Sequence, residues 1–293
     1  MTLLSPAQYQ PWGRGVYDVA PGLKPFGTDF GNGRLDQALF QMDSEFPRFR
    51  AGKLACMQER ASKYRVESQL DPVVASAAAE SIARSLCADW PELFTREGDL
   101  LNCAATGENV AVTLDDLLLQ VSEDVAIVQV EDGVDWISYL NLCSPSHWAA
   151  ESKIGSSFFK THVPIPGFER VNAAAGAMVD SMVRRGPYVR FVWGVESDDR
   201  PNHHPVPPPG QDPAEWHGRQ FEKGWTVRFE RQVVWGLPEV NAALFVIRVG
   251  FVPPVNVMAA QGSFEALCSA VRSMSPASLE YKGLQGFLAS VLP

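Results

Sequence analysis

The chain has 293 residues, of which 46% are hydrophobic and 20% are charged, and this composition predicts a globular protein with a large core. The net charge of −9 and the lack of a Lys/Arg cluster exclude nucleic acid as an expected partner, because phosphate binding requires such a cluster. The five cysteines are scattered without a C-x-x-C pair, which argues against a zinc site, a cysteine-ligated iron–sulfur cluster or a disulfide framework. No apolar stretch reaches about 18 residues and no signal-peptide pattern occurs, so we expect a soluble, cytoplasmic protein that does not enter a membrane.

Helices are predicted in the first third of the chain. A helical region extends from Leu35 to Tyr64, and Pro47 is expected to break it into two helices because proline removes a backbone donor. Asp71 and Pro72 form a typical helix start, with aspartate as the N-cap and proline as the first helical residue. The Ala-rich helix that follows is expected to extend to about Ala88.

Short strands and one short helix are predicted next. Residues 93–112 contain strand-like pieces separated by turns, and a short helix begins at Thr113 or Leu114. The segment 125–143 has two apolar runs joined by a Glu-Asp-Gly turn, which is typical of a β-hairpin.

The following segment is predicted to contain a short helix, a histidine and a longer helix. Residues 151–159 are expected to form the short helix, and His162 follows it, ahead of two prolines. Apolar residues between 168 and 182 recur at helical spacing and predict an apolar helix, which Gly186 and Pro187 terminate.

The last third of the chain favours an α+β fold. Strands are predicted at 188–196, 225–237 and 242–252, and two helices, 263–274 and 278–292, close the chain. Because strands and helices occur in groups without regular β-α-β alternation, we predict an antiparallel β-sheet flanked by helices. No Rossmann, P-loop or G-x-S-x-G motif supports a nucleotide site or a hydrolase.

Three regions of different character are expected. Residues 1–33 are rich in proline, glycine and aromatic residues without a period, which predicts an irregular N-terminal arm. Residues 34–293 are expected to form a single domain, with helical N- and C-terminal additions to the sheet. Within it, residues 197–223 are dense in proline and charge and predict a long surface loop.

His162 is the histidine whose surroundings best suit a ligand. It lies on a segment made rigid by Pro164 and Pro166, beside a predicted apolar helix. A neutral imidazole in such a place has suitable geometry for a metal or haem-iron ligand. The alternative, which the local sequence by itself favours, is a hydrogen-bonded, half-buried histidine.

The adjacent residues His203 and His204 lie in the Pro-rich loop. Adjacent histidines point to different sides of the chain and rarely bind one metal ion together, so a solvated loop is one interpretation. The other is that one of them, such as His204, covers the mouth of an active site. His147 and His217 have no supporting partner in the sequence.

Charged and aromatic residues alternate on the predicted strands. Arg228 and Glu230 share one face of their strand. One interpretation is a solvated sheet face with cross-strand ion pairs. The other is a polar pocket, in which arginines such as Arg190 bind an anion while Glu230 or Glu196 binds a cationic substrate. Trp193 is expected in the core or in a pocket wall.

Several blocks of residues, in order over about residues 25–290, jointly carry a resemblance to one known family. The blocks are Trp148, Lys153, Gly155, His162, Pro164 and Pro166; Arg190, Trp193, Gly194 and Val195; Val227 to Gln232 with Leu237 and Pro238; Ala243, Leu244, Phe245, Ile247 and Arg248; and Tyr281 with Lys282. Together they resemble the signature of the haem-dependent oxidative N-demethylase alpha-subunit-like family.

The resemblance implies a PAS-like antiparallel sheet that holds haem b, with a histidine on one side of the iron and a substrate pocket on the other. By this resemblance His162 is the axial ligand and the metal-binding residue. Lys153 and Arg228 are implied as partners of the haem propionates, and Arg190 and Trp193 as further cofactor contacts.

The implied activity is oxidative demethylation of a small secondary amine such as dimethylamine, by a monooxygenase-like oxidoreductase that releases formaldehyde. Glu230 is the implied orienting group for the amine. The chain has no flavin fingerprint and no cysteine cluster. FMN and a 2Fe–2S cluster are therefore expected only on partner subunits, in a hetero-oligomer or on a dissociable reductase.

Two departures from the family pattern bear on the substrate. Val192 stands where the family usually has asparagine, and the loop 197–223 replaces a compact segment. Two other functions stay open: a haem-binding PAS-like sensor or carrier without turnover, and a scaffold subunit that has lost its cofactor. The presence of His162 and Lys153 argues against the scaffold.

Overall fold

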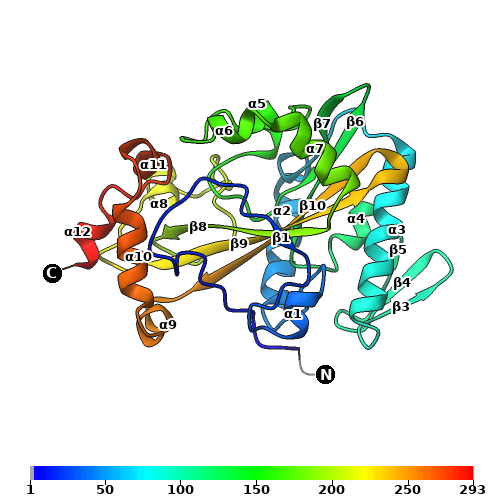
Figure 1. The fold of residues 1–293 in the computed structure, drawn as a ribbon. Helices are drawn as coiled ribbons and strands as arrows, with labels where there is room; N and C mark the ends of the chain where they lie inside the picture. The colour runs from blue at the N-terminus through cyan, green and yellow to red at the C-terminus, as the bar shows by residue number, and fades with distance from the viewer. Residues whose placement is uncertain (1–2, 293) are drawn as a thin grey trace.

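The computed structural model describes residues 3–292, the side chain of Arg170 excepted, and its centre is a seven-stranded antiparallel β-sheet (Figure 1). The strand order is β1-β8-β9-β10-β6-β7-β2. These strands are β1 Lys24–Pro25, β2 Arg65–Glu67, β6 Asp124–Glu131, β7 Val134–Asn141, β8 Tyr188–Glu196, β9 Thr226–Leu237 and β10 Ala242–Val252. The predicted α+β class and antiparallel sheet are confirmed, whereas the PAS-like character of the fold stays a prediction.

The two faces of the sheet carry different side chains. Cross-strand partners share a face, and β8 pairs with β9 so that Arg190, opposite Gln232, lies on the same face as Arg228 and Glu230. We call this the polar face. The other face, which we call the core face, packs against the long helix α3 (Pro72–Asp89), the helix α10 (Ser263–Arg272) and the N-terminal arm in the main hydrophobic cluster.

The N-terminal arm is irregular and its aromatic side chains enter the core. Within residues 3–33 the structure describes one strand, β1, which pairs with the start of β8. Tyr9 and Trp12 are buried, and the Trp12 indole donates to the backbone oxygen of Ser263 over 3.2 Å. The arm therefore contributes to the core although its sequence shows no period.

The N-terminal helical region forms two helices, as predicted, but Pro47 does not separate them. α1 is Arg34–Gln37 and α2 is Phe46–Tyr64, with Pro47 in the first turn of α2, where proline's missing N–H costs nothing. The segment between the two helices is irregular because it enters the core, where Phe40 and Met42 are fully buried. The predicted break at Pro47 is wrong for this reason: tertiary burial, not the proline, separates the helices.

The elements from residue 72 to residue 141 follow the prediction closely. α3 is Pro72–Asp89, and the Asp71 side chain accepts from the Val73 N–H as an N-cap. A second, three-stranded sheet and the hairpin β6–β7 also appear where turns were predicted. The remaining elements of this region are β3 Phe94–Glu97, β4 Leu100–Cys103, β5 Glu108–Ala111 and α4 Leu114–Leu117.

Short helices cover one end of the polar face. They are the 3₁₀ turn η1 Ala150–Ser152 and the helices α5 Phe158–His162, α6 Glu169–Asn172 and α7 Ala175–Arg184. The helix predicted over residues 151–159 is wrong, because Ser157 caps α5 by accepting from the Lys160 N–H and so starts the helix at Phe158. The single helix predicted after it is wrong, since the chain forms two helices, α6 and α7, with a short break between them. The apolar spacing continues across this break and therefore did not reveal it.

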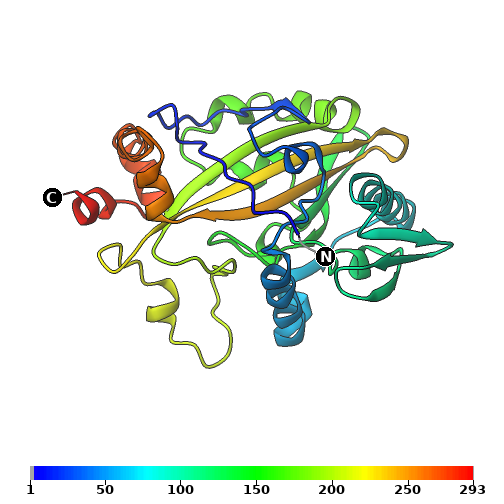
Figure 2. The same ribbon diagram turned by 90° about the horizontal axis from the view of Figure 1, so that it is seen from below.

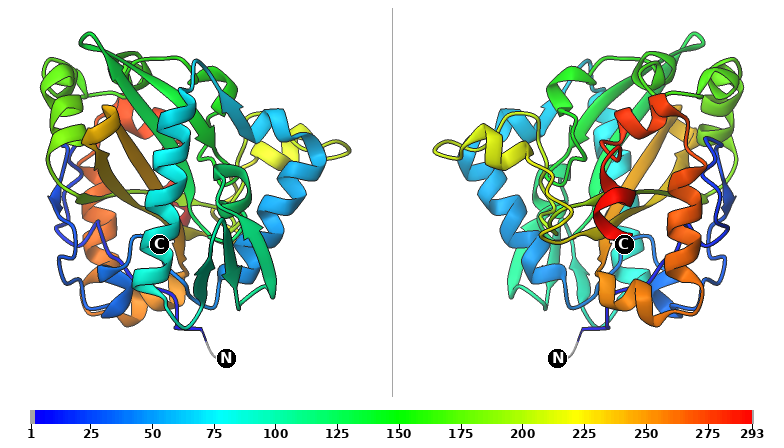
Figure 3. Two further views of the ribbon diagram at one scale, coloured as in Figure 1. Left: turned by 90° about the vertical axis from the view of Figure 1, so that its right-hand side faces the viewer. Right: turned by 90° about the vertical axis from the view of Figure 1, so that its left-hand side faces the viewer.

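The Pro-rich loop is only partly on the surface. Figure 2 shows it projecting from the sheet, and both views in Figure 3 show it beside α2. Yet His203 and His204 are 3% and 0% exposed, and His203 forms a parallel β-bridge with Ser146. The interpretation of these histidines as solvated is therefore wrong.

The loop and the C-terminal region contain more helices than predicted. They are α8 Pro213–His217, η2 Pro238–Val240, α9 Pro254–Ala259, α10 Ser263–Arg272, α11 Pro276–Tyr281 and α12 Phe287–Val291. The single terminal helix predicted over residues 278–292 is thus wrong, since Gly283, with φ +63°, lies between α11 and α12. None of the helices in residues 3–292 combines the length and apolar character that a bilayer crossing requires.

Candidate functional site

Titratable side chains from four parts of the chain gather at β8 and β9, on the polar face and around the free edge of β8. In Figure 1, α5 lies above the sheet, and α11 lies above and to the left of β8. We call these residues the polar cluster. Its members are Tyr17, Lys153, His162, Arg190, Glu230, Tyr281 and Lys282.

His162 is held with one ring nitrogen occupied and the other available. Its Nδ1 lies 2.7 Å from the backbone oxygen of Phe158, one turn earlier in α5. Because a carbonyl oxygen only accepts, Nδ1 carries the hydrogen and Nε2 keeps its lone pair. The Phe168 ring stacks on the imidazole, with ring centroids 4.7 Å apart. Burial lowers the pKa of His162, and the charges of Arg190 and Lys153 lower it further, although the bond to Phe158 opposes them. The imidazole is therefore kept neutral, as a metal ligand must be.

Two cations lie beside His162 without a carboxylate partner. Lys153 Nζ donates to the backbone oxygen of Thr161 over 3.0 Å, and burial lowers its pKa. Burial likewise lowers the pKa of Arg190, against the nearby charge of Glu230, and the Arg190 Nε is buried with no hydrogen-bond partner. Within residues 3–292, neither cation has a carboxylate oxygen within 4.0 Å. Such a pair is suited to bind negatively charged groups next to His162.

Glu230 is held on β9 by two neighbours. Its Oε2 accepts from Gln232 Nε2 over 2.9 Å, and its Oε1 lies 3.6 Å from Arg228 Nη2. Arg228 donates to two backbone oxygens, from Nη2 to Ser144 over 2.5 Å and from Nη1 to Pro201 over 2.7 Å. Arg228 thus joins the segment after β7 to the Pro-rich loop, and its role toward a propionate stays a prediction.

Three members of the polar cluster were given no role from the sequence. Lys282 Nζ donates to the backbone oxygen of Trp193 over 2.7 Å, at the edge of β8 that β1 leaves unpaired. Burial lowers the pKa of Lys282 to about 8, although the charges of Glu230 and Glu196 raise it.

The two tyrosines lie close to these charges. Burial raises the pKa of Tyr17 to about 12, with Tyr281 raising it further and Arg190 opposing. Tyr281 and Lys282 belong to a block that resembles the family, and this resemblance was the one feature of the sequence that could have pointed to them as site residues. Tyr17 lies in the arm, where the sequence shows no pattern, so only the fold reveals it.

Glu196 belongs to a separate ion cluster at the end of β8. Its Oε1 lies 3.0 Å from His147 Nε2 and 3.3 Å from Arg219 Nη2. Burial raises the pKa of Glu196, but the bond to His147 and the charge of Arg219 outweigh it and hold the pKa below its usual range. Both of these contacts are to Oε1, and a catalytic role for Glu196 stays a prediction.

His204 and Trp193 lie away from His162. The His204 ring packs edge-on against Tyr64 of α2, and its Nδ1 accepts from the Val206 N–H over 2.9 Å. The Trp193 ring is on the core face, 6.2 Å from that of Trp12, and only its backbone oxygen reaches Lys282. The structure does not bring either side chain to His162, and the roles predicted for them stay untested.

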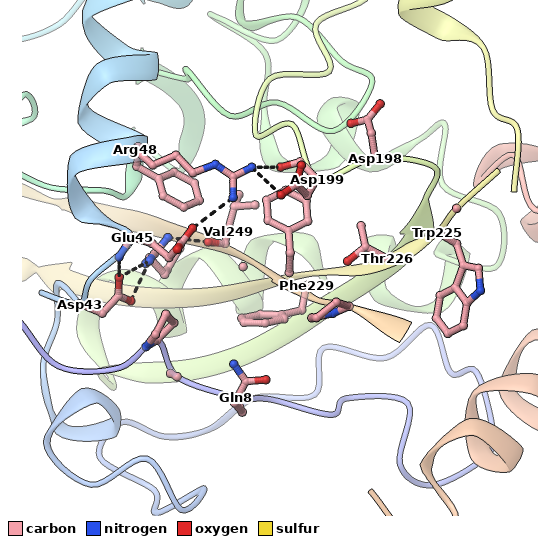
Figure 4. Close-up of a pocket in the computed structure, with 18 of the residues that line it drawn as sticks. Gln8, Asp43, Glu45, Arg48, Asp198, Asp199, Trp225, Thr226, Phe229 and Val249 are labelled. Atoms are coloured by element: carbon pink, nitrogen blue, oxygen red, sulfur yellow. Dashed lines mark hydrogen bonds and ion pairs between the residues drawn. The ribbon is translucent and has the colours of Figure 1, made fainter. Parts of the chain in front are cut away.

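A cavity of about 420 Å³ lies elsewhere, between α2, the arm, the Pro-rich loop and the ends of β9 and β10 (Figure 4). Its charged walls are largely paired: Arg248 holds Asp43 over 2.7 Å, and Arg48 lies 3.0 Å from Asp199 and 3.1 Å from Glu45. No histidine and no member of the polar cluster lines it. We therefore place the candidate site at the polar cluster, where unpaired donors and a free imidazole nitrogen occur together.

Among the residues that the structure describes, no three or more His, Cys, Asp or Glu side chains are arranged so that they could bind a metal ion together. A single histidine suffices for haem iron, because the porphyrin supplies four nitrogen ligands. The family model described as haem-dependent oxidative N-demethylase, alpha subunit-like, matches residues 33–292, which is nearly the whole chain. No curated protein matches the sequence.

Proposed function

Because the chain belongs to the haem-dependent oxidative N-demethylase alpha-subunit-like family, we propose that it binds haem b through His162 and oxidatively demethylates a small secondary amine. The observation that carries the proposal is the state of His162: Nδ1–H is bound to the Phe158 oxygen and Nε2 is free. An iron-binding histidine usually donates its other N–H to a carbonyl or carboxylate, which fixes the ring and raises its basicity.

The residues around His162 fit a haem group. Nε2 of His162 would hold the iron, and Phe158 and Phe168 supply apolar contacts to the imidazole, with ring centroids 4.2 Å and 4.7 Å from it. Lys153 and Arg190, which have no carboxylate partner within residues 3–292, would hold the two propionates. We assign Arg190 rather than Arg228 to this role, because Nη1 and Nη2 of Arg228 already donate to backbone oxygens.

Haem, when bound, supplies the redox chemistry that oxidises the N-methyl group. The net change converts R–NH–CH₃ and water into R–NH₂ and formaldehyde, and two protons and two electrons leave. Glu230 Oε1 would accept a hydrogen bond from the amine, because Arg228 lies 3.6 Å away, beyond hydrogen-bond distance. The same carboxylate can take the amine proton before oxidation, which turns the amine into the electron-rich form that is oxidised.

The electrons require partner proteins. The five cysteines of this chain are scattered and it has no flavin fingerprint, so we assign FMN and a 2Fe–2S cluster to separate subunits. The family description as alpha-subunit-like supports such a hetero-oligomer.

An absorption spectrum tests the proposal. Protein expressed with added haem precursor is expected to be red with a Soret band, and this band is expected to shift when dimethylamine or another methylated amine is added. With an electron acceptor present, formaldehyde is the expected product. A colourless protein under these conditions contradicts haem binding, and spectral shifts without formaldehyde for any amine support a sensor or carrier instead.

A further inference from the structure

Glu230 and Lys282 form a pair of opposite charges that do not touch. Lys282 Nζ binds the backbone oxygen of Trp193 on β8, and the preceding residue, Val192, is the cross-strand partner of Glu230, so the two groups are close. Yet in the part of the chain that the structure describes, no carboxylate oxygen lies within 4.0 Å of Lys282 Nζ, whose partner is the Trp193 backbone oxygen. The two charges are therefore neighbours that form no ion pair with each other, and a ligand carrying both charges could contact each of them.

The charges of the polar cluster do not balance. Three of its side chains are cations, Lys153, Arg190 and Lys282, and none has a carboxylate within ion-pair distance among residues 3–292. The single carboxylate, Glu230, already has Arg228 at 3.6 Å. Two propionates next to His162 account for Lys153 and Arg190 but leave Lys282. A largely buried cation without a carboxylate within ion-pair distance costs free energy, and an anionic ligand group would recover part of it.

Resting on the proposed function, we infer that the amine demethylated here also carries a carboxylate, as in an N-methylated amino acid. The ammonium group of such a zwitterion would contact Glu230, and its carboxylate would contact Lys282. N-methylglycine is the smallest molecule of this class. Dimethylamine has no carboxylate for Lys282 to bind, so it is expected to bind less well.

Equilibrium binding separates these substrates without a need for turnover. We would titrate the haem-loaded protein with N-methylglycine, with N-methylethanolamine, which replaces the carboxylate by a neutral CH₂OH group, and with dimethylamine, following the Soret shift. N-methylglycine is expected to bind at least about tenfold more tightly than the other two, as one charge-assisted hydrogen bond allows. Equal or tighter binding of N-methylethanolamine or dimethylamine overturns the inference.

Variants of Lys282 test the assigned contact. Lys282→Met removes the charge with little change in length and is expected to abolish the preference for N-methylglycine, whereas Lys282→Arg retains it. Lys223→Met, at an exposed lysine, is the matched control and is expected to behave as the parent protein. A preference that persists in Lys282→Met overturns the role of Lys282. If Lys282→Met does not fold, the comparison of ligands on the parent protein still decides the inference.

The outcomes distinguish the inference from the proposed function. A protein that binds haem and demethylates dimethylamine but shows no preference for N-methylglycine keeps the proposed function and refutes the substrate class. A protein that binds no haem, or whose spectrum responds to no amine, refutes both.

The preference is expected to depend on pH. Lysine is charged below its pKa, so with the pKa of Lys282 lowered to about 8 the attraction is present at pH 7 and is lost as the pH rises through about 8. Glu230, Glu196 and Arg219 are the charged groups that face Lys282, and the centroid of the Tyr17 ring lies 5.3 Å from its ammonium nitrogen. The ratio of the N-methylglycine and N-methylethanolamine dissociation constants, measured from pH 7 to 9.5, should approach one. A constant ratio contradicts the role of Lys282.

Discussion

Replacing His162 by alanine is expected to remove the Soret band of the haem-loaded protein and to weaken haem binding by at least about 100-fold, since loss of a group that merely orients a ligand already costs about 10 to 100-fold. The imidazole is the group next to Lys153 and Arg190 with an available nitrogen. A His162→Gly variant is expected to recover the band when free imidazole is added, which a purely structural role of the side chain does not predict. The measurement is a haem titration followed by absorption.

His217 provides the matched control for this experiment. It is exposed at the end of α8, so His217→Ala is expected to leave the spectrum and the haem affinity unchanged. Circular dichroism of both variants shows whether the fold is intact. An unaltered Soret band in well-folded His162→Ala would falsify the assignment of the axial ligand.

Replacing Asp43 by alanine is expected to destabilise the protein by about 3 to 5 kcal/mol, the usual effect of removing one partner of a buried ion pair. Both oxygens of Asp43 accept from Arg248 Nη2, over 2.9 and 2.7 Å, and the two side chains are only 1% and 4% exposed. The arginine that remains has Glu123 at 3.9 Å, a poor substitute. The melting temperature is expected to fall by roughly 6 to 15 °C.

A nearby exposed pair gives the comparison for Asp43. Glu45 and Arg48 lie 3.1 Å apart, with more than a third of each side chain exposed, so Glu45→Ala is expected to cost less than about 1 kcal/mol. The double variant Asp43→Ala with Arg248→Met removes both charges and should regain part of the stability. Similar losses for Asp43→Ala and Glu45→Ala would show that burial does not control the strength of these pairs.

Local sequence patterns predicted most of the sheet and the start of several helices. The alternation in β8, β9 and β10 has a period of two, and the N-cap at Asp71 depends on residues within one turn. Such signals are complete within a few residues, so no knowledge of the fold is needed to find them. The prediction failed at Pro47 and at α5, where burial or capping decided the boundary.

The candidate site was predictable only in part. The resemblance pointed to His162 and Lys153, and the period of β9 placed Arg228 and Glu230 on one face. The sequence could not show that Arg228 donates hydrogen bonds to the backbone oxygens of Ser144 and Pro201, because those residues lie 84 and 27 positions away from it in the chain. For the same reason the buried positions of His203 and His204 in a Pro-rich loop were missed.

The sequence by itself determined the α+β class, the family and the residue types available for binding, because composition, periodicity and motif spacing are properties of the chain. Only the tertiary structure decided which donors stay unpaired. It turned Nδ1 of His162 toward Phe158, left the Arg190 Nε without a hydrogen-bond partner among the described residues, and brought Lys282 to the edge of β8. Whether a polar group is satisfied depends on all its neighbours in space, and most of those neighbours are distant in the sequence.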